Sequence, residues 1–368
     1  MTEPEIIAAL RLQAIPNIGD ITAKKLIAHC GSPTAIFKDK LQHLLKIDGI
    51  GKMTLKGLFD AIHLEEAEAE YQYLLKKGIV ISYFEDEDYP SYLKHCIDGP
   101  ILLFKQGKID FQSGKIISVV GTRNITSYGH AFCEEFIEQI APLNPIIVSG
   151  FAYGVDITVQ KMAMEVGLQT IGCLAHGLNQ IYPKAHKKYK SKIENNGGFL
   201  TEFWSTSNPD RENFLKRNRI IAGLSEATIV VESAEKGGSL VTADLANGYD
   251  REVFAVPGRS TDKFSKGCND LIKRQKAHML TSAAEMIYLL GWDLEEKKAK
   301  SNIQKQLFVA LDETEQSIYS YLQLNGKQLL DTVALACKLP IQKTSSTLFT
   351  MEMKGVIRPL PGKLFEAI

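Results

Sequence analysis

The sequence predicts an α/β protein built on a doubly wound, mostly parallel sheet, preceded by a helical domain and followed by a winged-helix domain. From about Gly78 to Trp292, short apolar runs rich in β-branched residues alternate with helical stretches. Runs as apolar as IISVV and TIVVE are typical of strands that are covered on both faces. Helices between such strands imply right-handed crossovers and therefore parallel neighbours. We place the domains at residues 1–75, 76–292 and 306–368, with a charged linker at 293–305.

The composition of the chain restricts the class of protein and the cellular compartment that we expect. Its 45% hydrophobic and 23% charged residues are those of an ordinary soluble protein. The 43 basic residues balance 43 acidic ones, so any site for a polyanion must be local. Six cysteines lie far apart without a CxxC pair, which fits reduced thiols better than a disulfide frame or a zinc site. The N-terminus does not have the pattern of a signal peptide, and no apolar stretch approaches the length of a membrane span. We therefore expect a cytoplasmic protein.

Two similar turns divide the helices of the first domain, at residues 15–27 and 47–59. Each contains an apolar residue, a glycine and a helix start whose free amides can face a phosphate. The two glycines, Gly19 and Gly51, lie 32 residues apart, which makes this a repeated helix-hairpin-helix (SAM-like) pattern. Such turns either bind phosphate or only pack a helical bundle, and the sequence leaves both interpretations open. The first turn lacks the usual second glycine and is the weaker phosphate candidate.

The central domain contains nine predicted strands. They lie at residues 79–84, 101–105, 116–121, 146–150, 170–175, 198–202, 228–233, 252–257 and 278–280. In an open α/β sheet, ligands bind outside the carboxyl ends of the strands. The loops that follow strands are therefore the first candidates for a functional site.

Four such loops are rich in glycine, hydroxyl groups and cations. Their candidate phosphate-binding residues are Gly121, Thr122 and Arg123, then Ser149 and Gly150, then Lys184, and finally Gly237, Gly238, Ser239 and Thr242. Backbone amides, hydroxyls and a few cations form concavities that bind anions. A glycine after a strand is common by itself, so the prediction depends on four such loops at one sheet edge.

A cluster of basic residues precedes the strand at 228–233. Four cations lie within nine residues, against a single acid. The cations are Arg211, Lys216, Arg217 and Arg219, and the residues of this cluster that we expect to bind phosphate are Arg211, Arg217, Asn218 and Arg219. A local patch of this kind suits a polyanion that is held without being read base by base. Alone, the patch would be a solvated helix face with scattered ion pairs; beside four glycine-rich loops, phosphate binding is the better interpretation.

Catalysis has less support. None of the loops matches the GxGxxG fingerprint or the P-loop, and the histidines lack HExxH spacing, so we expect neither a cofactor nor a metal. Ser239, His176 and Asp156 could form a Ser–His–acid set, but no GxSxG nucleophile elbow is present. We interpret His176 as a polar loop residue and Asp156 as the N-cap of the next helix.

The last domain has the order of a winged helix, three helices followed by a hairpin. Residues 306–368 contain six basic and six acidic side chains. A winged helix that reads duplex DNA is normally basic, because phosphate neutralisation supplies most of the affinity. This one is predicted to bind protein or to assist DNA binding weakly, and packing against the α/β domain is the open alternative.

Taken together, these motifs resemble the DprA/Smf family (DNA processing protein A). The resemblance covers essentially the whole chain, with a specific core from Val119 to Ile272. It rests on GTR at Gly121, SGFAYGVD at Ser149, HGLNQIYPKAH at His176, RNRIIAGLS at Arg217, KGGSLVTA at Lys236, VFAVPG at Val253 and GCNDLI at Gly267. The resemblance implies an extended Rossmann-like fold for residues 76–292.

The resemblance also implies a protein that is not an enzyme. Family members bind the single-stranded DNA that enters during natural transformation, protect it and load the RecA recombinase onto it. They act as homodimers formed through the Rossmann-like domain. The family's DNA-binding cations correspond to Arg123, Lys184, Arg211, Arg217 and Arg219. Tyr153 stands where many members have an arginine, which removes a cation and offers a ring that could stack on a base.

Two other functions stay open. The phosphoribohydrolases of the lysine-decarboxylase-like group share this fold variant, and their PGGxGTxxE loop aligns with EKGGSLVTAD. In this chain Leu240 and Val241 replace the Gly-Thr pair, and the carboxylate position falls on Ala243 or Asp244, so the catalytic signature is broken. The other function is regulation of duplex DNA through the winged helix, and the lack of basic excess there argues against it.

Overall fold

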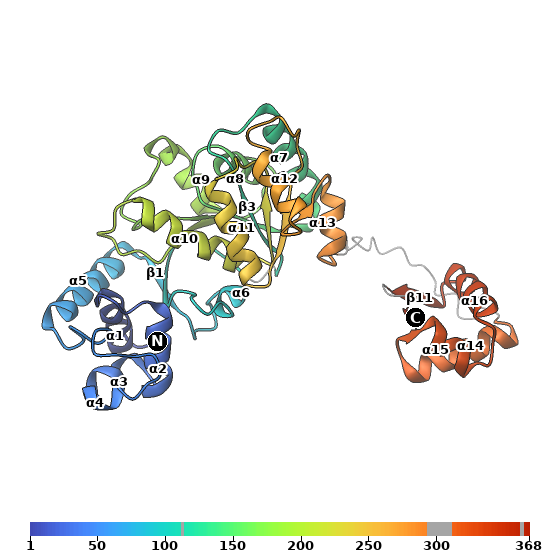
Figure 1. The fold of residues 1–368 in the computed structure, drawn as a ribbon, viewed down its shortest axis with the longest axis horizontal. Helices are drawn as coiled ribbons and strands as arrows, with labels where there is room; N and C mark the ends of the chain where they lie inside the picture. The colour runs from blue at the N-terminus through green and yellow to red at the C-terminus, as the bar shows by residue number, and fades with distance from the viewer. Residues whose placement is uncertain (112–113, 293–310, 361–363) are drawn as a thin grey trace. The chain divides into compact units, whose positions relative to one another are not determined.

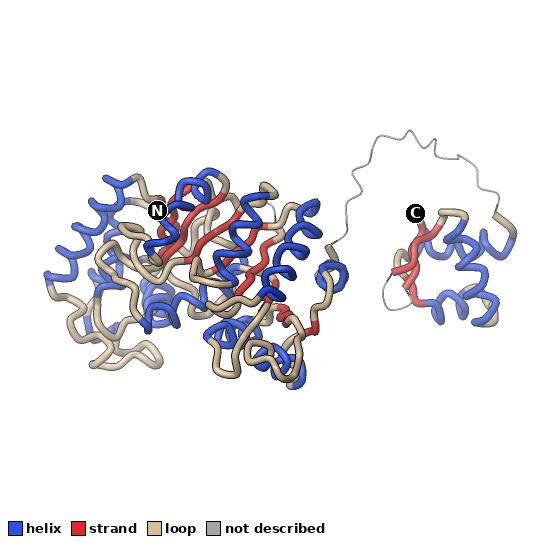
Figure 2. The backbone as a smooth tube through the Cα atoms, turned by 90° about the horizontal axis from the view of Figure 1, so that it is seen from above, coloured by secondary structure: helices blue, strands red, loops and turns tan. Residues whose placement is uncertain are grey.

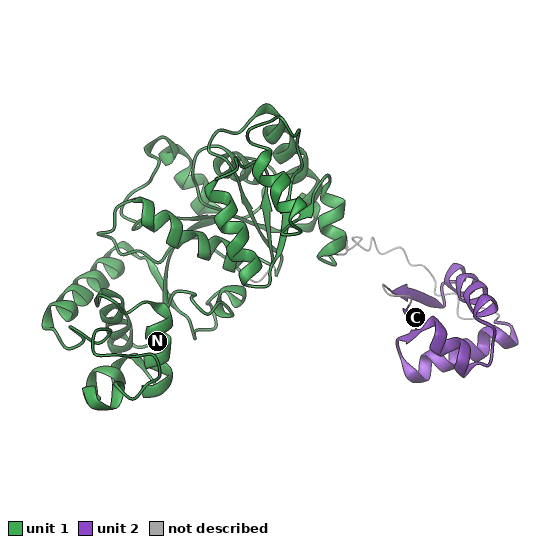
Figure 3. Ribbon diagram, viewed as in Figure 1, with its two compact units in different colours: residues 1–294 green, residues 295–368 purple. Residues whose placement is uncertain are grey.

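The computed structural model describes residues 1–111, 114–292, 311–360 and 364–368 (Figure 1). The chain forms two compact units, residues 1–294 and residues 295–368 (Figure 3). The first unit contains both the N-terminal helices and the large sheet. The linker predicted at 293–305 lies outside the described residues. Among the described residues, no helix is long and apolar enough to cross a membrane.

A nine-stranded sheet organises the first unit, with the strand order β1-β2-β6-β5-β4-β3-β7-β8-β9. Neighbours from β6 to β9 are parallel, whereas β2 runs antiparallel to both β1 and β6. The strands are β1 Val80–Tyr83, β2 Leu102–Gly107, β3 Ile116–Val120, β4 Ile146–Ser149, β5 Thr170–Cys173, β6 Gly197–Thr201, β7 Ala227–Val230, β8 Glu252–Ala255 and β9 His278–Met279. All nine predicted strands are present, and the mostly parallel sheet is confirmed.

The sheet is buried on both faces because alternate residues of its strands enter separate cores. In β3, Ile117 and Val119 pack in one core, while Ile116 and Val120 pack in the other. Figure 2 shows the strands with helices on either side. The first core receives side chains from α7 Ser127–Ile140, α8 Val155–Glu165 and α13 Ala283–Leu289, and the second from α10 Arg211–Leu224, α11 Gly238–Gly248 and α12 Lys266–Lys273. The remaining helical segments of this region are α6 Ser91–Lys94, η1 Ala141–Leu143, η2 Lys184–Tyr189 and α9 Lys190–Asn195.

The N-terminal region is helical, as predicted, but only one of its two hairpins forms. Its helices are α1 Glu3–Ala14, α2 Asp20–Cys30, α3 Pro33–Lys38, α4 Leu41–Leu44 and α5 Ala61–Lys77. The first hairpin runs from α1 through a turn into α2. After Gly51, residues 52–59 make successive turns, so the helix predicted there is wrong. Gly57 adopts a φ of +80°, a left-handed conformation that interrupts an α-helix.

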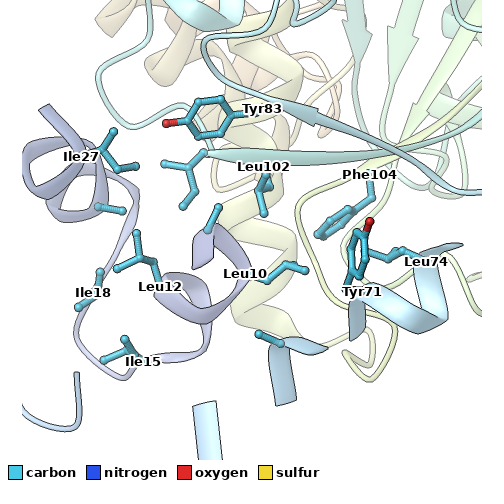
Figure 4. Packing of buried hydrophobic residues seen from close by; sticks show 14 of the residues in the cluster. Leu10, Leu12, Ile15, Ile18, Ile27, Tyr71, Leu74, Tyr83, Leu102 and Phe104 are labelled. Atoms are coloured by element: carbon cyan, nitrogen blue, oxygen red, sulfur yellow. The ribbon is translucent and has the colours of Figure 1, made fainter. Parts of the chain in front are cut away.

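The first hairpin packs against the edge of the sheet. Leu10 and Leu12 of α1 share a core with Leu102 and Phe104 of β2 (Figure 4). At the start of α2, the carboxylate of Asp20 accepts a hydrogen bond from the Ile101 amide at 2.8 Å. The start of α2 is therefore engaged with the α/β domain, which favours the packing interpretation for this hairpin.

The second unit is a winged helix, as predicted. Its elements are α14 Glu313–Asn325, β10 Gln328–Leu329, α15 Leu330–Ala336, α16 Ile341–Met353, β11 Ile357–Leu360 and β12 Leu364–Ala367, with the strand order β10-β12-β11. Its core contains Ile318, Leu348 and Met351. Arg358 forms an ion pair with Glu366 across the hairpin, so part of the balanced charge of this unit is neutralised internally.

Candidate nucleic-acid interface

A cleft of about 590 Å³ lies at the carboxyl ends of β3, β4 and β7. The loops after β3 and β4, helix α10 and the start of α11 line it. Ten of the predicted phosphate-binding residues meet there: Gly121, Thr122, Arg123, Arg211, Arg217, Asn218, Gly237, Gly238, Ser239 and Thr242. Loops separated by more than a hundred residues thus form one site, as the strand-end rule for open α/β sheets predicts.

The loop after β3 is held from both sides. The Thr122 amide donates to the carbonyl of Glu232 at 2.7 Å, and the Val155 amide donates to the carbonyl of Thr122 at 3.1 Å. The second contact requires Gly154, whose φ is +75° and whose added Cβ would lie 2.1 Å from the Thr122 carbonyl oxygen. Arg123 therefore extends from a fixed loop, and its side chain is exposed at the cleft.

The start of α11 presents backbone amides to the cleft. Gly237 is the N-cap residue, and a Cβ there would lie 2.1 Å from the Ser233 hydroxyl. The Ser239 hydroxyl donates to the Ser233 hydroxyl at 2.9 Å, which holds the turn closed. Gly238 is exposed, with nothing within 4 Å of where its Cβ would be. The free amides and the dipole of a helix start both favour a bound anion here.

Helix α10 divides the basic cluster between two sides. Arg211, Phe214 and Asn218 line the cleft, in keeping with the 3.6-residue period of an α-helix. Lys216 and Arg219 line a separate cavity of about 510 Å³, together with residues of α1 and α2. The cluster that looks continuous in sequence is therefore two sets of cations with different surroundings.

Arg217 lines the cleft but is almost completely buried. Only 4% of the residue is exposed, and Nη1 donates to the carbonyls of Gly150 at 2.7 Å and Cys173 at 2.5 Å. Burial lowers the pKa of Arg217, and the charge of Asp156 opposes that change. Burial likewise raises the pKa of Asp156, and Arg217 opposes it. The two side chains are a buried charge pair that organises the cleft floor.

Arg219 serves the contact between the helical domain and the α/β domain. Its guanidinium pairs with Asp20 at 2.9 Å and also with Glu202. Burial raises the pKa of Glu202, Arg219 opposes this change and the charge of Asp20 adds to it, so that the pKa is about 7. The family resemblance led us to expect that Arg219 binds DNA. Its guanidinium is instead held between two carboxylates of the protein, so we leave Arg219 out of the proposed interface.

An aromatic ring stands among the cations of the cleft. The guanidinium carbons of Arg123 and Arg217 lie 5.3 Å and 5.6 Å from the ring centroid of Phe214. The ring of Tyr182 lies 5.9 Å from the same ring. The sequence reasoning did not single out Phe214, although its position three residues after Arg211 places both on one helix face.

Three other predicted residues lie outside the lining of the cleft. The Ser149 hydroxyl is buried and donates to the Val119 carbonyl at 2.6 Å, which joins two strands. Gly150 contributes the carbonyl that Arg217 binds. Lys184 is exposed at the start of η2, two residues beyond Tyr182. Of the three, Lys184 alone has a side chain that can reach a ligand extending beyond the cleft.

Tyr153, the residue proposed to stack on a base, is 47% exposed in the loop between β4 and α8. Its ring centroid lies 4.9 Å from that of His186 in an edge-to-face arrangement. The Nδ1 atom of His186 lies 2.9 Å from the carbonyl oxygen of Phe151, and burial lowers the pKa of this histidine. The ring of His186 thus packs against Tyr153, and about half of Tyr153 stays exposed.

The possible Ser–His–acid set does not assemble. Ser239 and Asp156 line the cleft, whereas His176 is buried elsewhere with Nδ1 2.8 Å from the Gly177 carbonyl oxygen. Asp156 is also not the N-cap of α8: Gly154 is, because the helix begins two residues earlier than expected. The Asp156 carboxylate instead accepts a hydrogen bond from the Ala152 amide at 3.3 Å. Asp244, the possible phosphoribohydrolase carboxylate, pairs with Lys276 on the surface at 2.8 Å.

Fold and cleft together define a class: Rossmann-like α/β proteins with a cleft at the sheet edge that is lined by glycine-rich loops, hydroxyls and guanidinium groups. Residues 80–291 match the family model for DNA recombination-mediator protein A, and residues 306–363 match the DprA winged helix domain. The chain belongs to the DprA/Smf family.

Curated relatives and solved structures agree with this assignment. Protein Smf of Escherichia coli is 34% identical over 76% of this chain and 75% of its own. The X-ray structure of DNA processing protein A from Streptococcus pneumoniae matches 78% of this chain and 98% of its own, with 28% identity and a TM-score of 0.64. A DNA processing protein A from Helicobacter pylori, solved to explain its single-stranded DNA binding mode, covers 57% of this chain and 95% of its own, with 29% identity and a TM-score of 0.51.

Proposed function

We propose that this protein binds single-stranded DNA in the cleft between α10 and α11, without catalysing a reaction on it. The observation that carries the proposal is the arrangement of Arg123, Arg211 and Phe214 opposite the amides of the α11 start. Cations and amides can hold successive phosphates, while an aromatic ring receives a base. The relative from Helicobacter pylori, which is described as binding single-stranded DNA, supports this choice of ligand.

Binding in this cleft should depend little on base sequence. Its lining includes glycine-rich backbone, hydroxyls and guanidinium groups, which suit phosphate oxygens. A stacked base is accepted whatever its identity, because every base has a π-face. Asn124 and Asn218 are the amide side chains in the lining that could add a hydrogen bond to a base edge.

Family membership extends the proposal beyond the cleft. We infer that the protein protects DNA entering during natural transformation in the cytoplasm, acts as a homodimer through the α/β domain, and delivers the strand to RecA. This part rests on the family resemblance. The separation of Ser239 from His176 and the surface ion pair of Asp244 favour a binding role over an enzymatic one.

The first test replaces the two exposed cations of the cleft. An Arg123→Ala/Arg211→Ala variant should bind a labelled single strand of about 20 nucleotides more weakly at every salt concentration. Because each lost phosphate contact on a single strand removes about 0.7 from the slope of log affinity against log salt, the slope should flatten by about 1.4. Fluorescence anisotropy over a salt series measures both quantities.

A matched control removes the same charge elsewhere. Lys76 and Lys77 are exposed in the last turn of α5, outside the residues that line the cleft. Lys76→Ala/Lys77→Ala should keep the affinity and salt slope of the wild type. Equal losses of affinity in the two double variants would mean that only the net charge of the protein matters. A loss of affinity that depends on base sequence would contradict binding through phosphates.

A further inference from the structure

A second groove, of about 880 Å³, borders the start of α7 and the loop between β8 and α12. Arg259, Lys263 and Phe264 of that loop line it, together with Tyr128 of α7. None of these residues was among the predicted phosphate-binding residues. The groove nevertheless lies at the same edge of the sheet, since β8 ends beside β7 and runs parallel to it.

The groove and the cleft share a wall. Ser233 lines the cleft and Phe264 lines the groove, and the Ser233 amide donates to the Phe264 carbonyl at 2.6 Å. The loop after β3 likewise contributes Asn124 to the cleft and leads directly into Thr126 of the groove. A chain leaving the cleft across this wall therefore enters the groove next.

The chemistry of the groove suits a nucleic-acid strand. Arg259 and Lys263 are exposed, against one exposed carboxylate of the same loop, Asp262. Lys263 Nζ lies 5.7 Å from the ring centroid of Phe264, and Tyr128, which also lines the groove, is half exposed. Cations combined with aromatic rings are the groups with which proteins bind single strands without sequence preference.

Hydrogen bonds within the protein hold the walls of the groove. Asn269 holds Gly258 from both sides, since its Oδ1 accepts from the Gly258 amide at 3.2 Å and its Nδ2 donates to the Gly258 carbonyl at 2.9 Å. The Tyr128 hydroxyl donates to the Pro257 carbonyl at 2.7 Å and ties α7 to the loop. Glu232 also lines the groove, and its buried carboxylate accepts from the amide and the hydroxyl of Thr126 at 2.9 Å and 2.5 Å.

We propose that the groove is a second subsite for the strand, which runs from the α10–α11 cleft over the wall at Ser233 to Arg259 and Lys263. This inference rests on the proposed function of the cleft. It makes the binding site longer than the cleft, so that the groove contributes only to oligonucleotides long enough to reach it. The cleft, with its helix start, holds a short oligonucleotide by itself.

The test compares oligonucleotide lengths on the full chain. Arg259→Ala/Lys263→Ala should match the wild type on single strands of about 4 nucleotides, which is the low end of site sizes for such proteins. On about 20 nucleotides it should bind more weakly, with a salt slope flatter by about 1.4. Arg123→Ala/Arg211→Ala should lose affinity at both lengths, and thermal melting of each variant checks the fold.

The possible failures are distinguishable. If the wild type binds neither length at low salt, the proposed function itself is wrong. If the wild type binds both lengths and the groove variant matches it on both, the second subsite is wrong while the cleft stands. An equal loss at both lengths also overturns the subsite, because the two cations would then act through the general field of the protein.

Discussion

Arg217 ties helix α10 to the ends of two strands. Its guanidinium binds the carbonyl that follows β4 and the last carbonyl of β5, and it interacts with the buried charge of Asp156. A charge so enclosed is expensive to leave without its partner, whereas a solvent-exposed cation at the rim is not. We therefore propose that Arg217 shapes the cleft, while the exposed Arg123 and Arg211 reach the ligand.

Replacing Arg217 should mainly cost stability. Arg217→Ala leaves the Asp156 carboxylate and two carbonyls buried without their partner, and the free energy of unfolding should fall by about 3–5 kcal/mol. Arg211→Ala, an exposed change on the same helix, should stay within about 0.5 kcal/mol of the wild type. Urea denaturation measures both. A stable Arg217→Ala protein with impaired DNA binding would instead make Arg217 a direct phosphate contact.

At the scale of elements, α10 serves two partners at once. One side of the helix lines the cleft, and the other side carries Arg219 into the contact with α2 and Glu202. The carboxylates of Asp20 and Glu202 both pair with the single guanidinium of Arg219. If both were ionised, this buried group of three side chains would carry one more negative than positive charge. That excess, added to burial, explains why the pKa of Glu202 is raised.

The stability of this contact should depend on pH. Because the folded pKa of Glu202 is raised from 4.5 to about 7, the folded protein keeps a proton that the unfolded chain releases. The stabilisation is therefore fully present below about pH 4.5 and is lost as the pH rises through about 7. Glu202→Gln should remove that dependence, on the order of 1–3 kcal/mol between pH 5 and 8. Urea denaturation across this range checks it, and parallel profiles for variant and wild type would contradict it.

At the scale of the molecule, the winged helix and the rest of the chain differ in the placement of their charges and not in net charge. The unit that contains the cleft presents exposed arginines beside helix-start amides. Residues 306–368, which contain the winged helix, have six basic and six acidic side chains. Some of these charges pair with each other within the unit, as Lys354 does with Glu315. Affinity for DNA should follow the first unit.

A chain that ends at residue 292 should therefore keep its affinity for single strands within about threefold of the full chain, since few phosphate contacts are lost. Anisotropy titrations at equal salt measure this, with duplex of the same length as the comparison. A tenfold loss on truncation, or a preference of the full chain for duplex, would assign DNA binding to the winged helix instead.

Much of the fold follows from local pattern. The nine strands are predictable because strands covered on both faces need long apolar runs, and the cleft lies where glycine-rich loops follow those strands. Ten residues predicted from the loops and the basic cluster line the cleft for that reason. The helix expected after Gly51 was wrong because a positive φ at Gly57 breaks a pattern that otherwise looks helical.

The sequence by itself determined the order of domains, the strands of the sheet, the family and the sheet edge at which the cleft lies. Tertiary structure alone decided which cations are exposed at the cleft. Arg211, Arg217 and Arg219 have the same charge and lie within nine residues, yet one is exposed, one braces the cleft floor and one joins two domains. The reason is physical: the phase of a helix and the elements packed around it set the burial of each side chain. Burial decides whether a charge is available to a ligand or bound within the protein.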